Sequence, residues 1–384
     1  MSGNYSIMNY NEMIADPVRL KAYREAMRQS IHPDSVVTEI GTGSGYFAVF
    51  ACTLGARKVI AIEPNDAIIV AMEVAEHNEV RDRIEFHHAM SNMVTPSEKA
   101  DVIVSDMRGV LPFYGEHIRS IVDARTRLLK DGGTLIPSRD ELYAAFVSAP
   151  KHLRYFVEPE PLDNRSPSLY PTRWRLHNNW SKARILADEC ASEPIHIGTL
   201  EYSTIESPHF ASTFAWDAPE RTPVHGVCVW FDTVLLGDIG FSNAPSAPEA
   251  VYSQAFFPFP EEIVLEAGDR AEVAFRIIRA NNDYQYEWNT TISSAAAPSN
   301  IKAVHSQSTL RLQAMPHDKM RRRASHYTPV ATRNQELVKF VLERSDGTKF
   351  LDDIAGDLAE SFPDIFATRT AAFTFAADTL EQTR

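Results

Sequence analysis

The first part of the chain alternates short apolar runs with stretches in which apolar residues recur every three or four positions. Such runs are typical of buried strands, and the amphipathic stretches predict helices. Strands that alternate with helices predict an α/β fold with a mostly parallel, doubly wound sheet over residues 1–147. The predicted strands are 36–40, 58–62, 83–87, 100–105 and 134–136. The predicted helical stretches are 8–30, interrupted at Asp16-Pro17, 46–54 and 66–78, and a loop and helix are predicted over 106–129.

The pattern changes after residue 147. Short β-rich runs such as HIGTLEY and AEVAFRII follow one another without helices between them. This spacing predicts an antiparallel β-barrel or sandwich over residues 148–315. A stretch rich in tryptophan and arginine interrupts these runs and predicts a protruding arm near 165–190. A linker, 316–333, precedes a small helical module, 334–384, which resembles winged-helix or peptide-clasping modules in pattern; a capping or dimer-forming extension is an equal alternative.

Glycines cluster where the first strand should turn into its helix. The stretch reads E-x-G-x-G-x-G, with Glu39 followed by Gly41, Gly43 and Gly45. Glycine has no Cβ, so the backbone there can take positive φ and approach a ligand closely. The second strand ends at Glu63, an acid placed to accept the hydroxyl hydrogens of a ribose at the carboxyl edge of the sheet. The loop therefore predicts a nucleotide-type site, and the spacing resembles motif I of the class I S-adenosylmethionine-dependent methyltransferases rather than G-x-G-x-x-G.

Composition narrows the classes of partner. The 384 residues carry a formal charge of −13, which disfavours nucleic acid and suits a cationic partner. There is no apolar run long enough to cross a bilayer and no signal peptide, so we expect no membrane contact and a cytoplasmic protein. The three cysteines lack metal-ligand spacing, and His87 and His88 point to opposite faces of a strand, so no metal site is expected.

Four segments in order make a more specific resemblance. They are MIADPVRLKAY from Met13, the glycine loop with Glu63, VSDMRGVLPFYGEH from Val104, and LLKDGGTLIPSRDELYAAFV from Leu128. Over about residues 5–310 they resemble the protein arginine methyltransferase family. The resemblance implies a Rossmann-like domain followed by a β-barrel, S-adenosylmethionine as cofactor, and a homodimer made through an arm of the barrel.

The resemblance also assigns the cofactor residues. Arg19 would bind the cofactor carboxylate, and the three glycines would underlie its methionine and ribose portions. Glu63 would hold the ribose hydroxyls, and Met90 and Ser91 would lie by the adenine, although the family often has a glutamate where Ser91 stands. Glu39 has two readings, contact near the methionine end of the cofactor or ordering of the loop through backbone N–H groups.

The acceptor side departs from the family pattern. The family grips a guanidinium between two glutamates, in S-E-x-x-G and then Y-E, which orients the attacking nitrogen. Here Asp106 replaces the first glutamate, Gly115 replaces the second, and Glu116 follows one position late. One helical position is a turn of about 100°, so Glu116 is expected to point elsewhere unless the loop is rebuilt. The barrel segment that reads T-H-W in the family corresponds to Ala250, Val251 and Tyr252, without its histidine.

These residues predict an S-adenosylmethionine-dependent N-methyltransferase acting on arginine in a protein or peptide, on free arginine, or on a related small cationic amine. Asp106 and Glu116 are the catalytic candidates, which would orient the acceptor or take its proton. Met13 and Tyr114 are assigned to the acceptor side, and Arg108 either holds an anionic group or neutralises Asp106. The alternatives are a cofactor-binding scaffold without catalysis and a small-molecule O- or N-methyltransferase.

Overall fold

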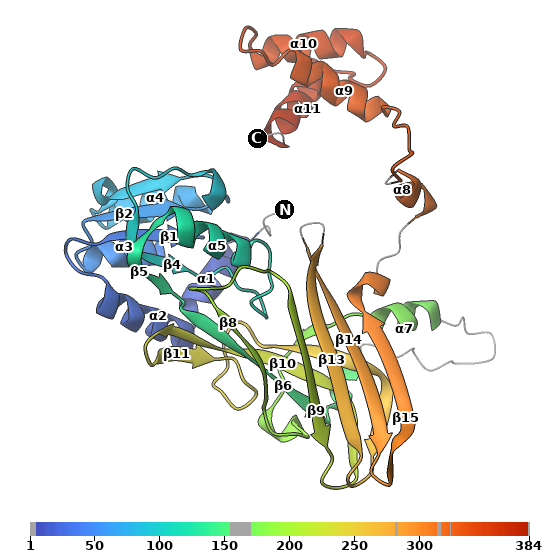
Figure 1. Ribbon diagram of the computed structural model, residues 1–384. Coiled ribbons are helices and arrows are strands. Elements are labelled where there is room, and N and C mark those ends of the chain that lie inside the picture. The colour runs from blue at the N-terminus through green and yellow to red at the C-terminus, as the bar shows by residue number, and fades with distance from the viewer. Residues whose placement is uncertain (1–4, 154–169, 281–282, 313–315, 323, 383–384) are drawn as a thin grey trace. The chain divides into compact units, whose positions relative to one another are not determined.

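The computed structural model describes residues 5–153, 170–280, 283–312, 316–322 and 324–382. The chain divides into two compact units, Met1–Gln313 and Ala314–Arg384. The first unit opens with a five-stranded parallel sheet in the order β3-β2-β1-β4-β5 (Figure 1). Its strands are β1 Val36–Ile40, β2 Lys58–Ile62, β3 Ile84–His87, β4 Ala100–Ser105 and β5 Leu129–Ile136. The predicted Rossmann-like α/β core is confirmed.

Helices precede and connect these strands. Asp16 separates the first two helices and caps the second, because its Oδ1 accepts hydrogen bonds from the Val18 and Arg19 backbone N–H groups at 2.9 and 3.1 Å. The second helix, α2, packs against β5 and also against strands of the following domain, so it joins the two folds. The helices are α1 Ile7–Ala15, α2 Pro17–Ser30, α3 Tyr46–Thr53, α4 Ala67–His77 and α5 His117–Arg127.

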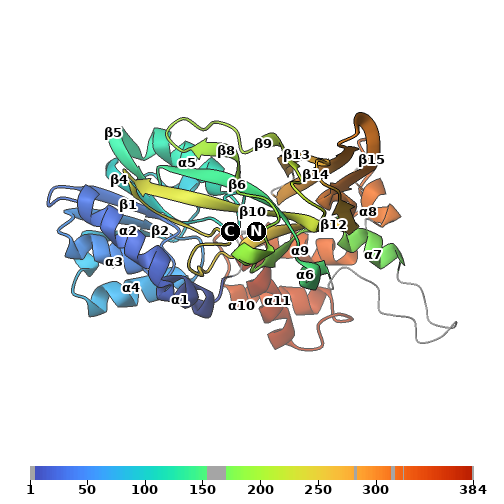
Figure 2. The same cartoon turned by 90° about the horizontal axis from the view of Figure 1, so that it is seen from below.

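Two antiparallel sheets follow. One has the order β7-β12-β10-β6-β8, with β11 paired to β10, and the other β15-β14-β13-β9 (Figure 2). Aromatic side chains of both sheets share one core, so the two sheets pack on each other, as expected for a barrel or a sandwich. The strands are β6 Arg139–Val147, β7 Ser181–Ala183, β8 Ile195–Glu201, β9 Phe210–Asp217, β10 Thr222–Leu236, β11 Ile239–Ser242, β12 Gln254–Leu265, β13 Arg270–Ala280, β14 Asp283–Ser294 and β15 Ala297–Ser308.

The border between the two folds lies earlier than the sequence pattern placed it. Strand β6 pairs with β8 and β10, so the antiparallel region begins at Arg139. The boundary expected after residue 147 therefore lies at the end of β6, one strand too late. The reason is that β6 follows β5 after a turn of two residues, and its apolar run reads equally well as a continuation of the α/β domain. Asp140 on this strand is buried, which proves important for the site.

Only part of the expected arm is described, since residues 154–169 lie outside the described structure. In the described structure, helix α6 Pro150–Leu153 precedes residues 154–169 and helix α7 Tyr170–Leu176 follows them. Trp180 packs on Phe257 and Tyr286 of the same chain, whereas Trp174 is 43% exposed. No helix among the described residues is both long and apolar enough to span a membrane.

The second unit contains helices with a core of their own. A short helix, α8 His317–Arg321, lies in the expected linker, and three longer helices follow. Leu337, Val341, Ile354 and Leu358 are buried at the centre of this small core. The three helices are α9 Arg333–Glu343, α10 Leu351–Ser361 and α11 Arg369–Gln382. No strand occurs between residues 324 and 382, so the finer winged-helix likeness stays a prediction.

Candidate functional site

The glycine loop lies at the carboxyl edge of the parallel sheet and needs its glycines. Gly41, Gly43 and Gly45 have φ values of 78°, 53° and 87°. These values lie in the left-handed region, which residues with a Cβ rarely adopt. A Cβ on Gly43 would stand 2.5 Å from Cδ1 of Tyr10, so helix α1 covers the loop closely. The loop therefore needs its glycines both for its backbone conformation and for the close packing of Tyr10.

Glu63 lies directly beside this loop and is 4% exposed. Its Oε2 accepts a hydrogen bond from the Gly43 N–H at 2.9 Å, and its Oε1 accepts one from the Asn65 N–H at 2.9 Å. Burial raises the pKa of Glu63 above its usual range, which those two backbone bonds partly oppose. Each oxygen has a second lone pair, so the carboxylate can still accept hydrogens from a pair of hydroxyl groups.

Glu39 orders the loop from inside. Its side chain accepts a hydrogen bond from the Thr42 hydroxyl, and the residue is 4% exposed. Burial raises its pKa to about 8, against the hydrogen bond from Thr42. Of its two readings, loop ordering is the one these contacts favour.

Met90 and Ser91 follow β3 on the same sheet edge, because the Glu63 N–H donates to the His87 carbonyl at 3.1 Å. Ser91 is buried, and its carbonyl accepts a hydrogen bond from Arg127 Nη2 at 2.7 Å. Ser91 begins a short 3₁₀ turn that ends at Met93. The chain thus brings both residues to the same end of the sheet as Glu63, as the resemblance requires.

Arg19 reaches the site from α2. Its Nε donates to Asp106 and its Nη1 donates to the Met13 carbonyl at 3.1 Å. The guanidinium also lies over the rings of Tyr23 and Phe47, 5.2 Å from each centroid. Its Nη2 finds no hydrogen-bond acceptor among the described residues, so Arg19 keeps donors for an anionic group such as a carboxylate.

Asp106, just after β4, is surrounded by donors from three parts of the chain. Its Oδ2 accepts hydrogen bonds from Arg19 and, at 2.5 Å, from the Tyr252 hydroxyl. Its Oδ1 accepts one from Arg108 Nε at 3.1 Å. Burial alone would raise the pKa of Asp106, but Arg108 and Arg19 together hold it well below its usual range. The carboxylate is therefore ionised and already paired within the protein.

Arg108, which pairs with Asp106, is held in place by further buried hydrogen bonds. Its side chain has no exposed surface, and its Nη1 donates to Asp140 Oδ1 at 2.8 Å and to the Thr233 hydroxyl at 2.6 Å. Its Nη2 donates to the Tyr23 hydroxyl at 2.7 Å. Of the two roles predicted for Arg108, these contacts support neutralisation of Asp106 rather than capture of an anionic substrate group.

The buried network continues into the barrel. The Tyr202 hydroxyl donates to Asp140 Oδ2 at 2.5 Å and lies 2.8 Å from His117 Nε2. Because the hydroxyl proton goes to Asp140, His117 must donate through Nε2. Burial, with the charge of Arg108, lowers the pKa of His117 to about 3. The chain of contacts thus runs without a gap from α5 through the barrel to Asp106.

Glu116 has different partners. Its side chain pairs with Arg279 of β13, which also donates to the Gly115 carbonyl, and it lies 4.0 Å from Arg119. It shares no hydrogen-bond partner with Asp106 in the described structure. The loop position expected to redirect Glu116 therefore leads it to the barrel wall, and a catalytic role for Glu116 stays a prediction without geometric support.

Tyr114 is 38% exposed, and its ring centroid lies 6.3 Å from that of Tyr5. Tyr5 in turn lies 5.8 Å from Tyr10, which covers the glycine loop. Met13, whose carbonyl binds Arg19, belongs to the same helix as Tyr10. Both acceptor-side candidates thus connect to the helix that covers the cofactor loop.

The barrel segment without the family histidine still contacts the site. The Val251 N–H donates to Asp16 Oδ2 at 2.7 Å, which joins this segment to the N-cap of α2. Tyr252 supplies the hydroxyl that binds Asp106. The sequence showed that the histidine is absent but did not predict either of these contacts.

The residues that sequence reasoning missed are mainly barrel residues. Asp140 carried a signal: it shares the inward register of β6 with Leu142 and Ala144, and an acid at such a position needs a buried partner. The other missed residues carried none. Two of them lie on helices α1 and α2, Tyr10 and Tyr23, and three come from the β-rich region far away in sequence, Tyr202, Thr233 and Arg279.

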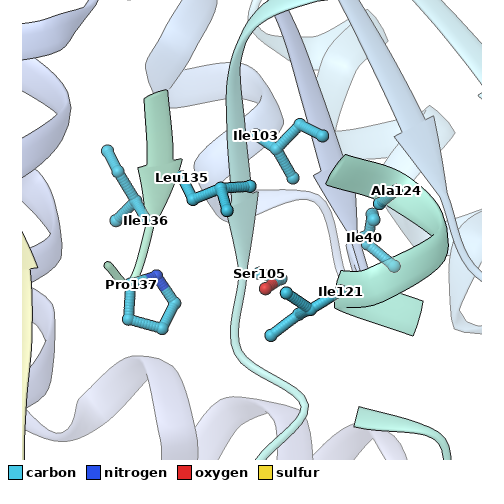
Figure 3. Close-up of a pocket in the computed structure, with 8 residues that line it drawn as sticks. All are labelled: Ile40, Ile103, Ser105, Ile121, Ala124, Leu135, Ile136 and Pro137. Atoms are coloured by element: carbon cyan, nitrogen blue, oxygen red, sulfur yellow. The ribbon is translucent and has the colours of Figure 1, made fainter. Parts of the chain in front are cut away.

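A small apolar pocket lies under this edge of the sheet, as Figure 3 shows. It offers no room for a water molecule and is lined by Ile40, Ile103, Ser105, Ile121, Ala124, Leu135, Ile136 and Pro137. We regard it as a packing gap behind the site. Among the described residues no group of three or more histidine, cysteine or acidic side chains could hold a metal ion.

Comparisons with known proteins agree with this geometry. A family model described as ribosomal protein L11 methyltransferase matches residues 21–139, and one described as the PRMT5 oligomerisation domain matches residues 197–313. A probable protein arginine N-methyltransferase 6.2 of Oryza sativa is 25% identical over 301 residues, which span 76% of this chain and 75% of the relative. A probable protein arginine N-methyltransferase 6 of Arabidopsis thaliana is 30% identical over 62% of this chain and 55% of its own.

Solved structures show the same fold. Protein arginine methyltransferase 10 of Arabidopsis thaliana superposes with a TM-score of 0.69 at 20% identity, covering 79% of this chain and 98% of that one. The Trypanosoma brucei PRMT1 enzyme–prozyme complex with AdoHcy gives 0.68 at 20% identity, covering 78% and 96%. The glycine loop, the buried acids and these likenesses together support a class I methyltransferase with a protein arginine methyltransferase-like architecture.

Proposed function

We propose that this protein transfers a methyl group from S-adenosylmethionine to an arginine nitrogen of a protein or peptide. One observation carries the proposal. The positive-φ glycine loop, Glu63 and Arg19 meet at one sheet edge beside an ionised Asp106. The names of the relatives supply the acceptor, since both curated relatives described above are called protein arginine N-methyltransferases.

The residues present fit the cofactor. The loop carries no Cβ at Gly41 and Gly43, Glu63 would accept the ribose hydroxyls, and Arg19 would hold its carboxylate through Nη2. When bound, S-adenosylmethionine supplies an electrophilic methyl group. Tyr10 on α1 would close over it and exclude water, because its ring already lies against Gly43.

Asp106 would orient the acceptor rather than take its proton. Its pKa lies well below the usual range, which makes it a weak base at neutral pH. An ionised carboxylate can still accept an N–H of the acceptor and point the neighbouring nitrogen toward the methyl group. Positioning of this kind is a large part of the rate enhancement in a direct displacement.

The experiment that tests the proposal measures S-adenosylhomocysteine release by the purified chain with an arginine-rich peptide, free arginine and a panel of small amines. Release should occur with the arginine-rich peptide and should disappear in Glu63→Ala. Glu76→Ala, an exposed position of α4, is the matched control and should behave as wild type. Cofactor binding without release for any acceptor would contradict the proposal and favour a scaffold role.

We further propose a cytoplasmic homodimer in which the helical module of residues 334–384, winged-helix-like or not, helps recognise the acceptor protein. The match of residues 197–313 to an oligomerisation-domain model supports a dimer. Light scattering of the purified chain tests the assembly, and a monomer at micromolar concentration would refute it. Removal of residues 325–384 should reduce activity on a peptide but not on free arginine.

A further inference from the structure

Asp106 has less capacity for an acceptor than an unpaired carboxylate has. A carboxylate offers about four lone-pair positions. Arg19 and Tyr252 take both positions on Oδ2, and Arg108 takes one on Oδ1. One position therefore remains, on Oδ1, and the side chain is 5% exposed.

Arg108 cannot leave to make room. Its three nitrogens donate to Asp106, Asp140, Thr233 and Tyr23, and its side chain is fully buried. Moving it would leave the fully buried Asp140 without its ion pair, which is strongly unfavourable. The contact with Asp106 is thus a fixed part of the site and not a placeholder that a substrate displaces.

We propose that Arg108 is a specificity-determining residue, which restricts Asp106 to a single hydrogen bond with the methyl acceptor. The inference rests on the proposed methyl transfer at Asp106. A guanidinium is distinguished from an amine by its planar fork of donors, which pairs with both oxygens of a carboxylate at once. Since the Asp106 carboxylate has one lone pair left, a guanidinium can form no more hydrogen bonds with it than an amine can. The second candidate carboxylate, Glu116, is occupied by Arg279.

The consequence is weak discrimination between guanidinium and amine acceptors. The wild-type chain should use an arginine peptide and the matched lysine peptide with similar kcat/KM. Freeing Oδ1 should restore the preference for the fork, by roughly tenfold or more, the size of one added hydrogen bond to a charged group.

The test compares kcat/KM for the two peptides in the full chain and its variants. R108M/D140N removes both members of the buried ion pair together, so no unpaired charge is left behind. Its arginine-to-lysine ratio should rise at least roughly tenfold. R108Q is the second variant, whose amide can still donate to Asp140, and it should move the ratio in the same direction.

Two controls separate specificity from folding. R108K keeps a cation beside Asp106 and should retain the wild-type ratio. Y202F removes the hydroxyl that binds Asp140 but leaves Arg108 on Asp106, so it can lower the melting temperature without moving the ratio. A merely structural Arg108 would reduce both activities together.

Binding gives a readout that does not need turnover. The dissociation constants of the two peptides for protein loaded with S-adenosylhomocysteine should show the same rise in ratio. If the wild type releases no product with either peptide, the proposed function fails, while this ratio still tests Arg108. An unchanged ratio in folded R108M/D140N and folded R108Q overturns the inference.

Discussion

The two sides of the site are built in opposite ways. On the cofactor side, the glycine loop has no Cβ at three positions, Glu63 keeps free lone pairs, and Arg19 keeps free donors. On the acceptor side, Asp106 and Glu116 are both occupied by the protein's own arginines, Arg108 and Arg279. The cofactor side thus keeps hydrogen-bonding groups that are free for a ligand, whereas most of those on the acceptor side are already bonded within the protein.

This difference shows which parts of an architecture can change independently. The cofactor groups lie on one sheet edge and on α1 and α2, close in sequence. The acceptor groups depend on β6, β10 and β13, which approach only through the fold. A change of one barrel residue can therefore alter the acceptor side and leave cofactor binding intact.

Asp106→Asn should have the largest effect. It leaves Arg19 and Arg108 without their shared carboxylate, so kcat/KM should fall by roughly a hundredfold or more and the free energy of unfolding by about 3 kcal/mol. Glu116→Gln breaks only a partly exposed pair, so its effect on stability should stay below about 1 kcal/mol. Steady-state kinetics and urea unfolding of both variants make the comparison, and equal losses in kcat/KM would contradict it.

Gly43→Ala should come next and should act on the cofactor side. The added Cβ meets the Tyr10 ring and must also adopt positive φ, so affinity for S-adenosylmethionine should fall at least roughly tenfold. Gly132→Ala is the matched control, because Gly132 has φ of 76° but open space around it. Calorimetric titration measures both. Similar affinities for the two variants would show that Tyr10 does not lie against the loop.

Tyr252→Phe should act on the acceptor side alone. It removes one hydrogen bond to the ionised Asp106, so kcat/KM should fall by about tenfold while the cofactor dissociation constant stays unchanged. Tyr143→Phe, which removes a hydroxyl from Glu141 at 3.2 Å outside the site, should leave both values at wild type. A weaker cofactor affinity in Tyr252→Phe would mean that the two sides are not separable.

His117→Gln should have the smallest effect on activity and should show itself in the pH dependence of stability. The folded pKa of His117 is about 3, below its ordinary value of 6.5, so on acidification the unfolded chain binds a proton that the native state refuses. This contribution is present above pH 6.5 and is lost progressively as the pH falls toward 3.

The variant should therefore lose about 2 kcal/mol less than wild type between pH 7 and pH 5. Thermal unfolding at the two pH values measures the difference. His77→Gln, at the exposed end of α4, should follow the wild-type curve. If His117→Gln and wild type lose the same stability between the two pH values, His117 would be protonated in the folded protein, against this account.

The parallel sheet and the cofactor loop could be predicted because their signals are local. Asp16 precedes a proline, Gly41 to Gly45 follow a strand, and Glu63 ends the next one, so each role could be inferred within a few residues of sequence. The redirection of Glu116 followed from one helical position. The partner that receives it, Arg279, lies more than a hundred residues away and gave no signal.

On the acceptor side, the sequence predicted only which residues differ from the family pattern. The missing glutamate and histidine were visible, but the replacements were not, since Tyr252 binds Asp106 through a hydroxyl whose direction depends on the fold. Arg108 was read with two possible roles, and only the buried Asp140 decides between them. Contacts between distant strands are set by packing, which a single sequence does not reveal.

The most direct test of the account is a calorimetric titration of the full chain with S-adenosylmethionine, for wild type, Glu63→Ala and Asp106→Asn. The account predicts one cofactor per chain, a large loss of affinity in Glu63→Ala, and retained binding in Asp106→Asn despite its loss of turnover. Absence of binding to wild type, or the same affinity in Glu63→Ala, would contradict the claim that the open side of this site holds the cofactor.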